Sequence, residues 1–204
     1  MRSINKSEYL NMIHKEFIKI HLIESAATKE RIAENCTENI SRAVELIKTS
    51  ITNGGKMLIC GNGGSAADAQ HLAAEFIIRL NHDIVRPAIP AIALTTDTSI
   101  LTAGGNDIGF NNIFSRQVEA LGKFGDVFLG ISTSGNSENV LRAAQKAKEA
   151  GMVTIGFLGK DGGKAGKLFD LSINIPSDNT QHIQEGHITI GHIICELVER
   201  DLYA

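Results

Sequence analysis

Residues 126–137 read DVFLGISTSGNS, and residues 56–66 read KMLICGNGGSA. Each stretch begins with a short apolar run and then passes into a loop of small and polar residues. A continuous apolar run, without alternation, is typical of a strand that is covered on both faces, as in a parallel sheet. Both stretches therefore predict a buried strand followed by a loop that opens a helix.

Three further apolar runs have the same character, and helical stretches separate them. The additional strands are predicted at 88–94, 152–158 and 170–175, and the helices near 65–80, 111–122, 137–150 and 180–202. Strands that alternate with helices predict an α/β fold, here a three-layer αβα sandwich around a five-stranded parallel sheet.

Two more helices are predicted ahead of the first strand, over residues 4–24 and 28–52. Their apolar stripes are Leu10, Ile13, Phe17 and Ile20 in the first, and Ile32, Cys36, Ile40, Ala43, Ile47 and Ile51 in the second. We expect these stripes to form a helix bundle with another subunit, and the alternative is packing against the chain's own sheet. Residues 1–204 are predicted to be a single domain, with oligomerising helices in 1–53 and the α/β core in 54–204.

Composition narrows the class of protein. The 204 residues are 43% hydrophobic and 21% charged, as in soluble globular proteins. A net charge of -3 provides no basic field for nucleic acid, and no apolar run is long enough for a membrane helix, so we expect neither partner. The three cysteines form no CxxC motif and the first ten residues contain no apolar signal region, which favours a reducing, cytoplasmic location.

The loop at 132–137 is suited to phosphate. It contains four hydroxyl side chains, and the helix that follows adds free backbone N–H groups and a partial positive charge. One hydroxyl is explained by an N-cap, but four are not. The alternative is an ordinary Ser/Thr-rich turn.

The other loop matches G-x-G-x-x-A at Gly61, Gly63 and Ala66, which alone is a weak dinucleotide signal. A dinucleotide-binding site needs an acidic residue at the end of the second strand, whereas Asp83 precedes that strand. We therefore expect no nucleotide cofactor and assign the glycines to close backbone approach to a small polar ligand.

Two helices carry candidate reactive groups. His71 and Glu75 are four residues apart and share a helix face, a spacing that also suits metal ligands. Gln184 and His192 lie about 12 Å apart along the last helix. A surface pair and a core histidine are the alternatives.

Four segments together closely resemble the phosphoheptose isomerases, which belong to the sugar-isomerase (SIS) domain superfamily. They are GNGGS at 61–65, GGNDIGFNNIFSRQVEALG at 104–122, GISTSGNS at 130–137 and IQEGHITIGHI at 183–193. The resemblance covers nearly the whole chain. It implies a homotetramer with active sites between subunits and the conversion of D-sedoheptulose 7-phosphate to D-glycero-D-manno-heptose 7-phosphate, the first step towards the nucleotide-activated heptose of lipopolysaccharide or capsule.

The resemblance also implies roles for individual residues. The catalytic pair matches Glu75 and His192, and the zinc ligands of some members match His71, Glu75, Gln184 and His192. The substrate contacts match Asn62, Gly63, Gly64, Ser65, Glu75, Asn106, Asp107, Ser132, Thr133, Ser134, Ser137 and Gln184. The chain departs from the family at His182, where members often have arginine, and at Gln181, where some members have aspartate.

These implied roles agree with the chemistry of aldose–ketose isomerisation, which needs a base over the carbon and an acid at the oxygens. The main alternative is a non-catalytic SIS protein that binds the replication initiator or senses a sugar phosphate. In the initiator-binding relative, the positions of Glu75 and His192 hold other residues, so their presence here favours the enzyme.

Overall fold

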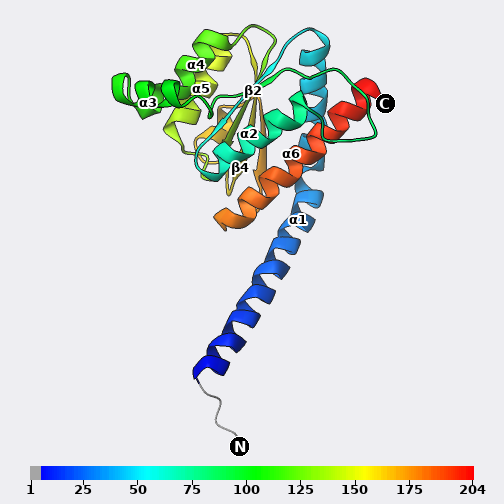
Figure 1. Cartoon of the computed structure of the whole chain (residues 1–204), viewed down its shortest axis with the longest axis vertical. Helices are drawn as coiled ribbons and strands as arrows, with labels where there is room; N and C mark the ends of the chain where they lie inside the picture. Colours follow the sequence, from blue (N-terminus) through cyan, green and yellow to red (C-terminus); the bar gives the residue numbers. More distant parts are fainter. Residues whose placement is uncertain (1–5) are drawn as a thin grey trace, which may run out of the picture.

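The computed structural model describes the backbone of residues 6–204 and the side chains of residues 10–204. Five parallel strands form one sheet in the order β2-β1-β3-β4-β5 (Figure 1). The strands are β1 (Met57–Gly61), β2 (Ala91–Ala93), β3 (Val127–Ser132), β4 (Val153–Gly159) and β5 (Leu171–Ile175). The predicted five-stranded parallel sheet is confirmed. The second strand is shorter than predicted because Pro90 directly precedes it and cannot donate to the ladder.

Helices cover both faces of the sheet, which confirms the three-layer arrangement. On one face lie α1 (Lys6–Thr52), α2 (Gly64–Ile77) and α6 (Thr180–Tyr203), and on the other lie α4 (Ile113–Leu121) and α5 (Glu138–Glu149). Successive residues of β1 enter opposite cores, since Met57 packs with the first group of helices and Leu58 with the second. Two 3-10 turns, Phe110–Asn112 and Ala165–Lys167, complete the connections.

The prediction of two separate N-terminal helices is wrong. The structure has one continuous helix, α1, of 47 residues (Figure 1), and the predicted residues 4 and 5 lie outside the described range. The expected break falls at Ser25-Ala26-Ala27, which contains neither glycine nor proline. Nothing there interrupts the helical hydrogen bonds, so the two stripes belong to one helix.

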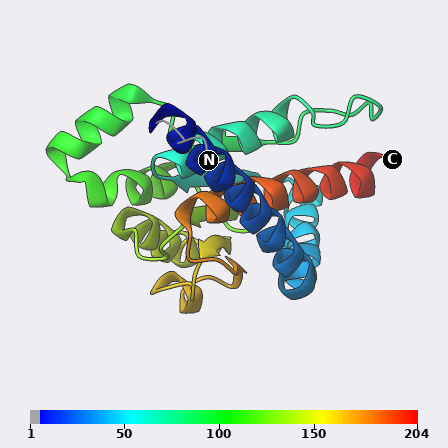
Figure 2. The same ribbon diagram turned by 90° about the horizontal axis from the view of Figure 1, so that it is seen from below.

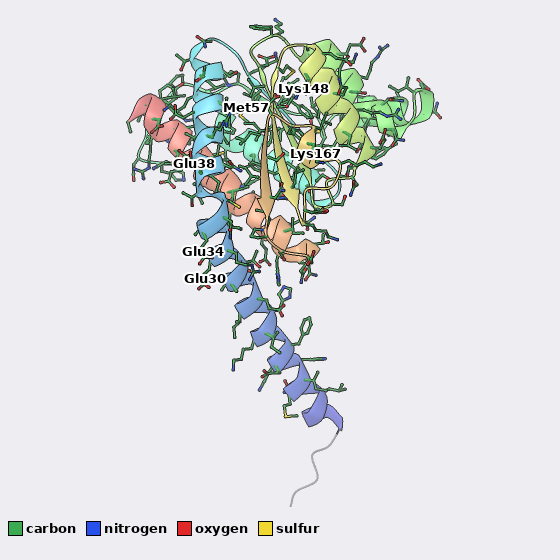
Figure 3. The ribbon with its side chains drawn as sticks, turned by 180° about the vertical axis from the view of Figure 1, so that it is seen from behind. Glu30, Glu34, Glu38, Met57, Lys148 and Lys167 are labelled. Atoms are coloured by element: carbon green, nitrogen blue, oxygen red, sulfur yellow. The ribbon has the colours of Figure 1, made fainter. Side chains whose placement is uncertain are left out.

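The two halves of α1 have different surroundings. In the second half, Ile32, Cys36, Ile40, Ala43 and Ile47 are buried against the sheet and α6 of the same chain. The expected bundle with another subunit is therefore wrong for this stripe, and the alternative holds. Glu30, Glu34 and Glu38 lie on the side of α1 that faces away from the sheet (Figure 3).

The first half of α1 projects beyond the α/β body (Figures 1 and 3). Its large apolar side chains are exposed, including Phe17 at 68% and Ile20 at 47%. Contiguous exposed apolar side chains of this kind mark an interaction surface. No helix within residues 6–204 is long and apolar enough to cross a membrane.

One helix was not predicted. Helix α3 (Thr98–Asp107) ends with Gly104 and Gly105 near its C-terminus, and glycine is a poor helix former. Its start carries a signal, because Asp97 caps it by accepting the N–H of Ile100 at 2.9 Å. None of the residues of α3 is buried, and Leu101 is a partly buried side chain through which the helix packs against the core beneath α4 and α5.

His187 on α6 should make folding stability depend on pH. The side chain is fully buried, and Nε2–H donates to the carbonyl of Leu158 at 2.9 Å. Burial lowers the pKa of His187 from 6.5 to about 4, and the hydrogen bond opposes this shift only in part. Below pH 6.5 the unfolded chain binds a proton that the folded chain rejects.

We expect this residue to remove about 3 kcal/mol of stability as the pH falls from 6.5 to about 4. Urea unfolding of wild type and His187→Gln at both pH values measures the effect. The glutamine amide can still donate to the Leu158 carbonyl but does not titrate. Equal pH dependence in the two proteins contradicts the prediction.

Candidate functional site

The candidate site lies at the carboxyl ends of β1 and β3. These strands are neighbours in the middle of the sheet, and the chain continues from β1 to one edge and from β3 to the other. Ligands of open α/β sheets bind at such a reversal of strand order, because the loops there diverge and leave a crevice. The polar loops after Gly61 and after Ser132 both lie at this point.

The hydroxyl-rich loop, residues 132–137, leads directly into α5. The hydroxyls of Ser132 and Ser137 lie 3.1 Å apart, so the two ends of the loop face each other. Ser137 occupies the N-cap position of α5, yet its side chain makes no capping hydrogen bond. The capping explanation for this hydroxyl therefore does not apply, and its oxygen is available to a ligand together with the exposed Ser134.

A second loop, which contains Gly162 and Ala165, packs against the hydroxyl-rich loop. Gly135 has a φ of +63°, and a Cβ at this position would lie 1.9 Å from the carbonyl oxygen of Gly162. The carbonyl of Gly135 accepts the N–H of Ala165 at 2.9 Å, and Asn136 Oδ1 accepts the N–H of Lys164 at 3.1 Å. The segment 162–165 thus fixes the shape of the loop, a role that the sequence analysis missed.

The loop after β1 is tied to the same place. Asn62 and Asn139 exchange two amide hydrogen bonds of 2.9 Å, which join this loop to the first turn of α5. The Asn62 side chain therefore holds the two loops together. Ser65 is buried and Gly63 is the N-cap of α2, with a φ of +56° that suits glycine.

Helices α2 and α6 run side by side in the same direction (Figure 2). A Cβ on Gly64 would lie 2.6 Å from Nε2 of Gln184, and one on Gly191 would lie 2.6 Å from a methyl group of Leu72. Farther along, Glu199 accepts the N–H of Leu80 at 3.0 Å. The two glycines explain how the helices come close enough for their side chains to meet.

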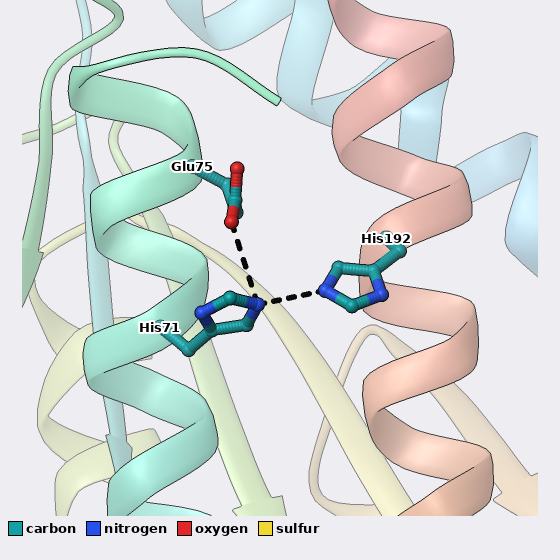
Figure 4. A group of neighbouring side chains, drawn as sticks. All are labelled: His71, Glu75 and His192. Carbon is teal, nitrogen blue, oxygen red and sulfur yellow. Dashed lines mark hydrogen bonds and ion pairs between the residues drawn. The ribbon is translucent and has the colours of Figure 1, made fainter. Parts of the chain in front are cut away.

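His71, Glu75 and His192 meet between these helices (Figure 4). The Nε2 atoms of His71 and His192 lie 2.8 Å apart, and His71 Nε2 is 3.4 Å from Glu75 Oε1. One ligand atom from each residue lies within 4.8 Å of the other two. Two imidazole nitrogens and a carboxylate that converge in this way can hold a metal ion.

The structure brings together only part of the predicted site in one chain. His71, Glu75 and His192 converge, and Gln184 packs on Gly64 at the beginning of α2. By contrast, Asn106 and Asp107 lie at the end of α3, where Asn106 Nδ2 donates to Asp107 Oδ1 at 2.7 Å. Neither makes another side-chain hydrogen bond to a described residue.

Asp68 is a candidate functional residue that the sequence analysis missed. It precedes His71 by three residues on α2, so both share one helix face, and this spacing was the available signal. Its Oδ2 atom is buried and has no hydrogen-bond partner among residues 10–204. Burial raises the pKa of the Asp68 carboxyl, and the neighbouring His71 partly opposes that shift.

Comparison with known proteins identifies the family of the chain. The SIS domain family model matches residues 21–159. A phosphoheptose isomerase from Clostridium acetobutylicum is 52% identical over 191 residues, which are 93% of this chain and 96% of that protein.

Two solved structures extend the likeness. The phosphoheptose isomerase of Neisseria gonorrhoeae superimposes with a TM-score of 0.86 at 45% identity, covering 91% of this chain and 98% of that one. The structure from Francisella tularensis gives a TM-score of 0.88 at 37% identity, with coverage of 92% and 98%. The chain therefore belongs to the SIS domain family and, within it, to the phosphoheptose isomerases.

Proposed function

We propose that this protein converts D-sedoheptulose 7-phosphate to D-glycero-D-manno-heptose 7-phosphate through an enediol. The product is the starting point of nucleotide-activated heptose for lipopolysaccharide or capsule. One observation carries the proposal: a carboxylate and an imidazole from two parallel helices face each other, and Asn62 joins the loop that begins one of these helices to the helix that follows the hydroxyl-rich loop. The isomerase relatives at about half identity support the same substrate.

The proposed substrate lies with its phosphate in the hydroxyl loop. The phosphate oxygens accept hydrogen bonds from the first N–H groups of α5 and from the hydroxyls of Ser132, Thr133, Ser134 and Ser137. The remaining proposed contacts are Asn62, Gly63, Gly64, Ser65, Glu75 and Gln184. Asn106 and Asp107 complete the set at a site shared between subunits, since both are exposed at the end of α3 and their side chains hydrogen-bond only to each other among the described residues.

Glu75 and His192 perform the proton transfers. Glu75 takes a proton from C1 of the open-chain ketose, and an enediol forms. Glu75 then returns the proton to C2, which gives the aldose. His192 moves the proton between the two oxygens on those carbons. A positioned acid or base contributes about 10²–10⁴-fold to such a reaction.

We propose zinc as the metal of the group, held by His71, Glu75 and His192, with Gln184 as the fourth predicted ligand. The donor set fits, because two neutral imidazoles and a carboxylate are preferred zinc ligands. When bound, zinc polarises the carbonyl and hydroxyl oxygens of a sugar. A Glu75 carboxylate that held zinc tightly would not be free to act as a base, so zinc would serve to position groups or to hold the resting site.

Zinc should stabilise the folded protein. At a zinc concentration of about 100 times Kd, binding adds about 2.7 kcal/mol to the free energy of unfolding, because the unfolded chain lacks the site. Thermal unfolding with and without zinc measures the shift. In His71→Gln we expect a much smaller shift, whereas His82→Gln, on the loop after α2, should respond like wild type. An equal response in all three proteins contradicts the site.

We also propose that the protein is a homotetramer whose first halves of α1 pack together. The exposed apolar residues of this segment support the proposal. An apolar groove of about 270 Å³ between α1 and α6 extends the surface, and Ile193 and Leu197 in it are 40% and 38% exposed. A second copy of this chain would cover both surfaces.

A proton NMR time course with sedoheptulose 7-phosphate, before and after chelation of metal, tests the proposed function. We expect the aldose signals of the heptose phosphate to grow. Binding without turnover points instead to a sugar-phosphate sensor. Capture of the replication initiator without turnover points to the non-catalytic alternative, which the presence of Glu75 and His192 disfavours.

A further inference from the structure

A buried ion pair joins the ends of the two helices that carry the proposed catalytic residues. Arg86 lies in the connection between α2 and β2, and Glu199 lies on α6, seven residues beyond His192. Both side chains are only 1% exposed. Seven residues are close to two helical turns, so Glu199 and His192 lie on nearly the same side of α6, about 10 Å apart along its axis.

Arg86 caps the end of α2. Its Nη2 donates to the carbonyl of Glu75 at 2.8 Å, and its Nη1 donates to the carbonyls of Phe76 and Pro87 at 2.8 and 2.9 Å. Carbonyls in the last turn of a helix have no intrahelical partner, so a guanidinium there satisfies them and complements the helix dipole. One of these carbonyls belongs to the proposed catalytic base itself.

Glu199 completes the connection from the other helix. Its carboxylate accepts Nε–H of Arg86 at 2.7 Å and the backbone N–H groups of Leu80 and Asn81 at 3.0 Å each, and Arg86 Nη2 also donates to it. Burial alone would raise the pKa of the Glu199 carboxyl, but these hydrogen bonds outweigh burial and lower it. The Glu199 carboxylate therefore stays charged. In these contacts Arg86 uses all five of its N–H donors.

We propose that Arg86 and Glu199 are positioning residues, which set the axial register and rotation of α2 against α6 and thereby hold Glu75 opposite His192. This inference rests on the proposed isomerase function. A buried ion pair is seldom needed for stability, because apolar residues of similar volume often stabilise as well. Its planar, multiply bonded geometry does fix orientation, which an apolar contact does not.

Two variants separate positioning from folding. Arg86→Lys keeps the charge opposite Glu199 but cannot bond the helix carbonyls and the carboxylate in one plane, and we expect kcat to fall about 10-fold. Arg86→Met combined with Glu199→Met removes both charges, and we expect kcat to fall about 100-fold, as for a displacement of about 1 Å. In both, KM should change less than about 2-fold, because the phosphate loop is untouched.

Asp126→Asn is the matched control. Asp126 is also buried, pairs with Lys56 and accepts the N–H groups of Lys56 and Lys123, but it lies at the amino ends of β1 and β3, opposite the site. We expect this variant to lower Tm without changing kcat at a temperature where all variants are folded. If the double variant does not fold, Arg86→Lys decides the question.

The imidazole ¹⁵N signals of His71 and His192 provide a readout that does not depend on turnover. We expect them to shift in Arg86→Lys and to stay unchanged in Asp126→Asn. Wild-type kcat together with wild-type imidazole signals in Arg86→Lys overturns the positioning role. If the wild-type protein does not turn over sedoheptulose 7-phosphate, the proposed function fails and the imidazole signals alone decide the inference.

Discussion

Glu75→Gln is expected to lower kcat for sedoheptulose 7-phosphate by about 10²–10⁴-fold, because an amide cannot accept the carbon proton at neutral pH. The change preserves the shape of the side chain, and the carboxylate of Glu75 lies 3.4 Å from Nε2 of His71, whose side chain is exposed. Stability should therefore change little. Initial rates over a range of substrate concentrations, together with thermal unfolding of each protein, measure both effects.

Glu119→Gln serves as the control for this substitution. Glu119 is an exposed carboxylate on α4, paired with Arg116 at 2.8 Å, and lies across the sheet from Glu75. The same chemical change there should leave kcat at the wild-type value. Turnover close to wild type in Glu75→Gln removes Glu75 from the role of base, and the proposed mechanism with it.

Phe17→Glu combined with Ile20→Glu is expected to dissociate the oligomer. Both side chains are exposed in the single chain and would be buried in the proposed bundle, where unpaired carboxylates are costly to desolvate. Since the proposed site draws Asn106 and Asp107 from a shared boundary, turnover should fall about 100-fold with assembly. Light scattering coupled to size-exclusion chromatography gives the mass of the particle.

A control with the same change in net charge keeps the comparison fair. Asn11→Glu with Lys15→Gln also makes the chain more negative by two charges, at polar positions of the same segment, away from the stripe of Phe17 and Ile20. This variant should remain an oligomer and active. If the Phe17 and Ile20 variant keeps the wild-type mass, the packing of α1 is not what holds the copies together.

The sequence was sufficient for most of the architecture because the signals for it are local. Continuous apolar runs such as MLIC and VFLGI predict buried parallel strands wherever they occur. The same locality explains two errors. The chain around Ser25 has no helix breaker, so α1 continues where two helices were expected. Helix α3 was not predicted because it contains glycines, although Asp97 caps its start.

The candidate site could be predicted only in part from the residues. The spacing of His71 and Glu75 indicates one helix face, and a hydroxyl-rich loop before a helix indicates an anion site. Spacing along α6 favoured a core histidine at position 192, and the resemblance to a family was needed to pair it with Glu75. Asp68, with a buried oxygen that has no hydrogen-bond partner in the described part of the chain, was not predicted.

The sequence by itself determined the layers, the strands and the loops at the reversal of strand order, because each depends on residues adjacent in the chain. Only the tertiary structure decided which side chains meet. His71 contacts His192 across 121 residues, and Arg86 contacts Glu199 across 113. Such contacts depend on how closely α2 and α6 approach at Gly64 and Gly191, and the packing of the whole sheet sets that distance.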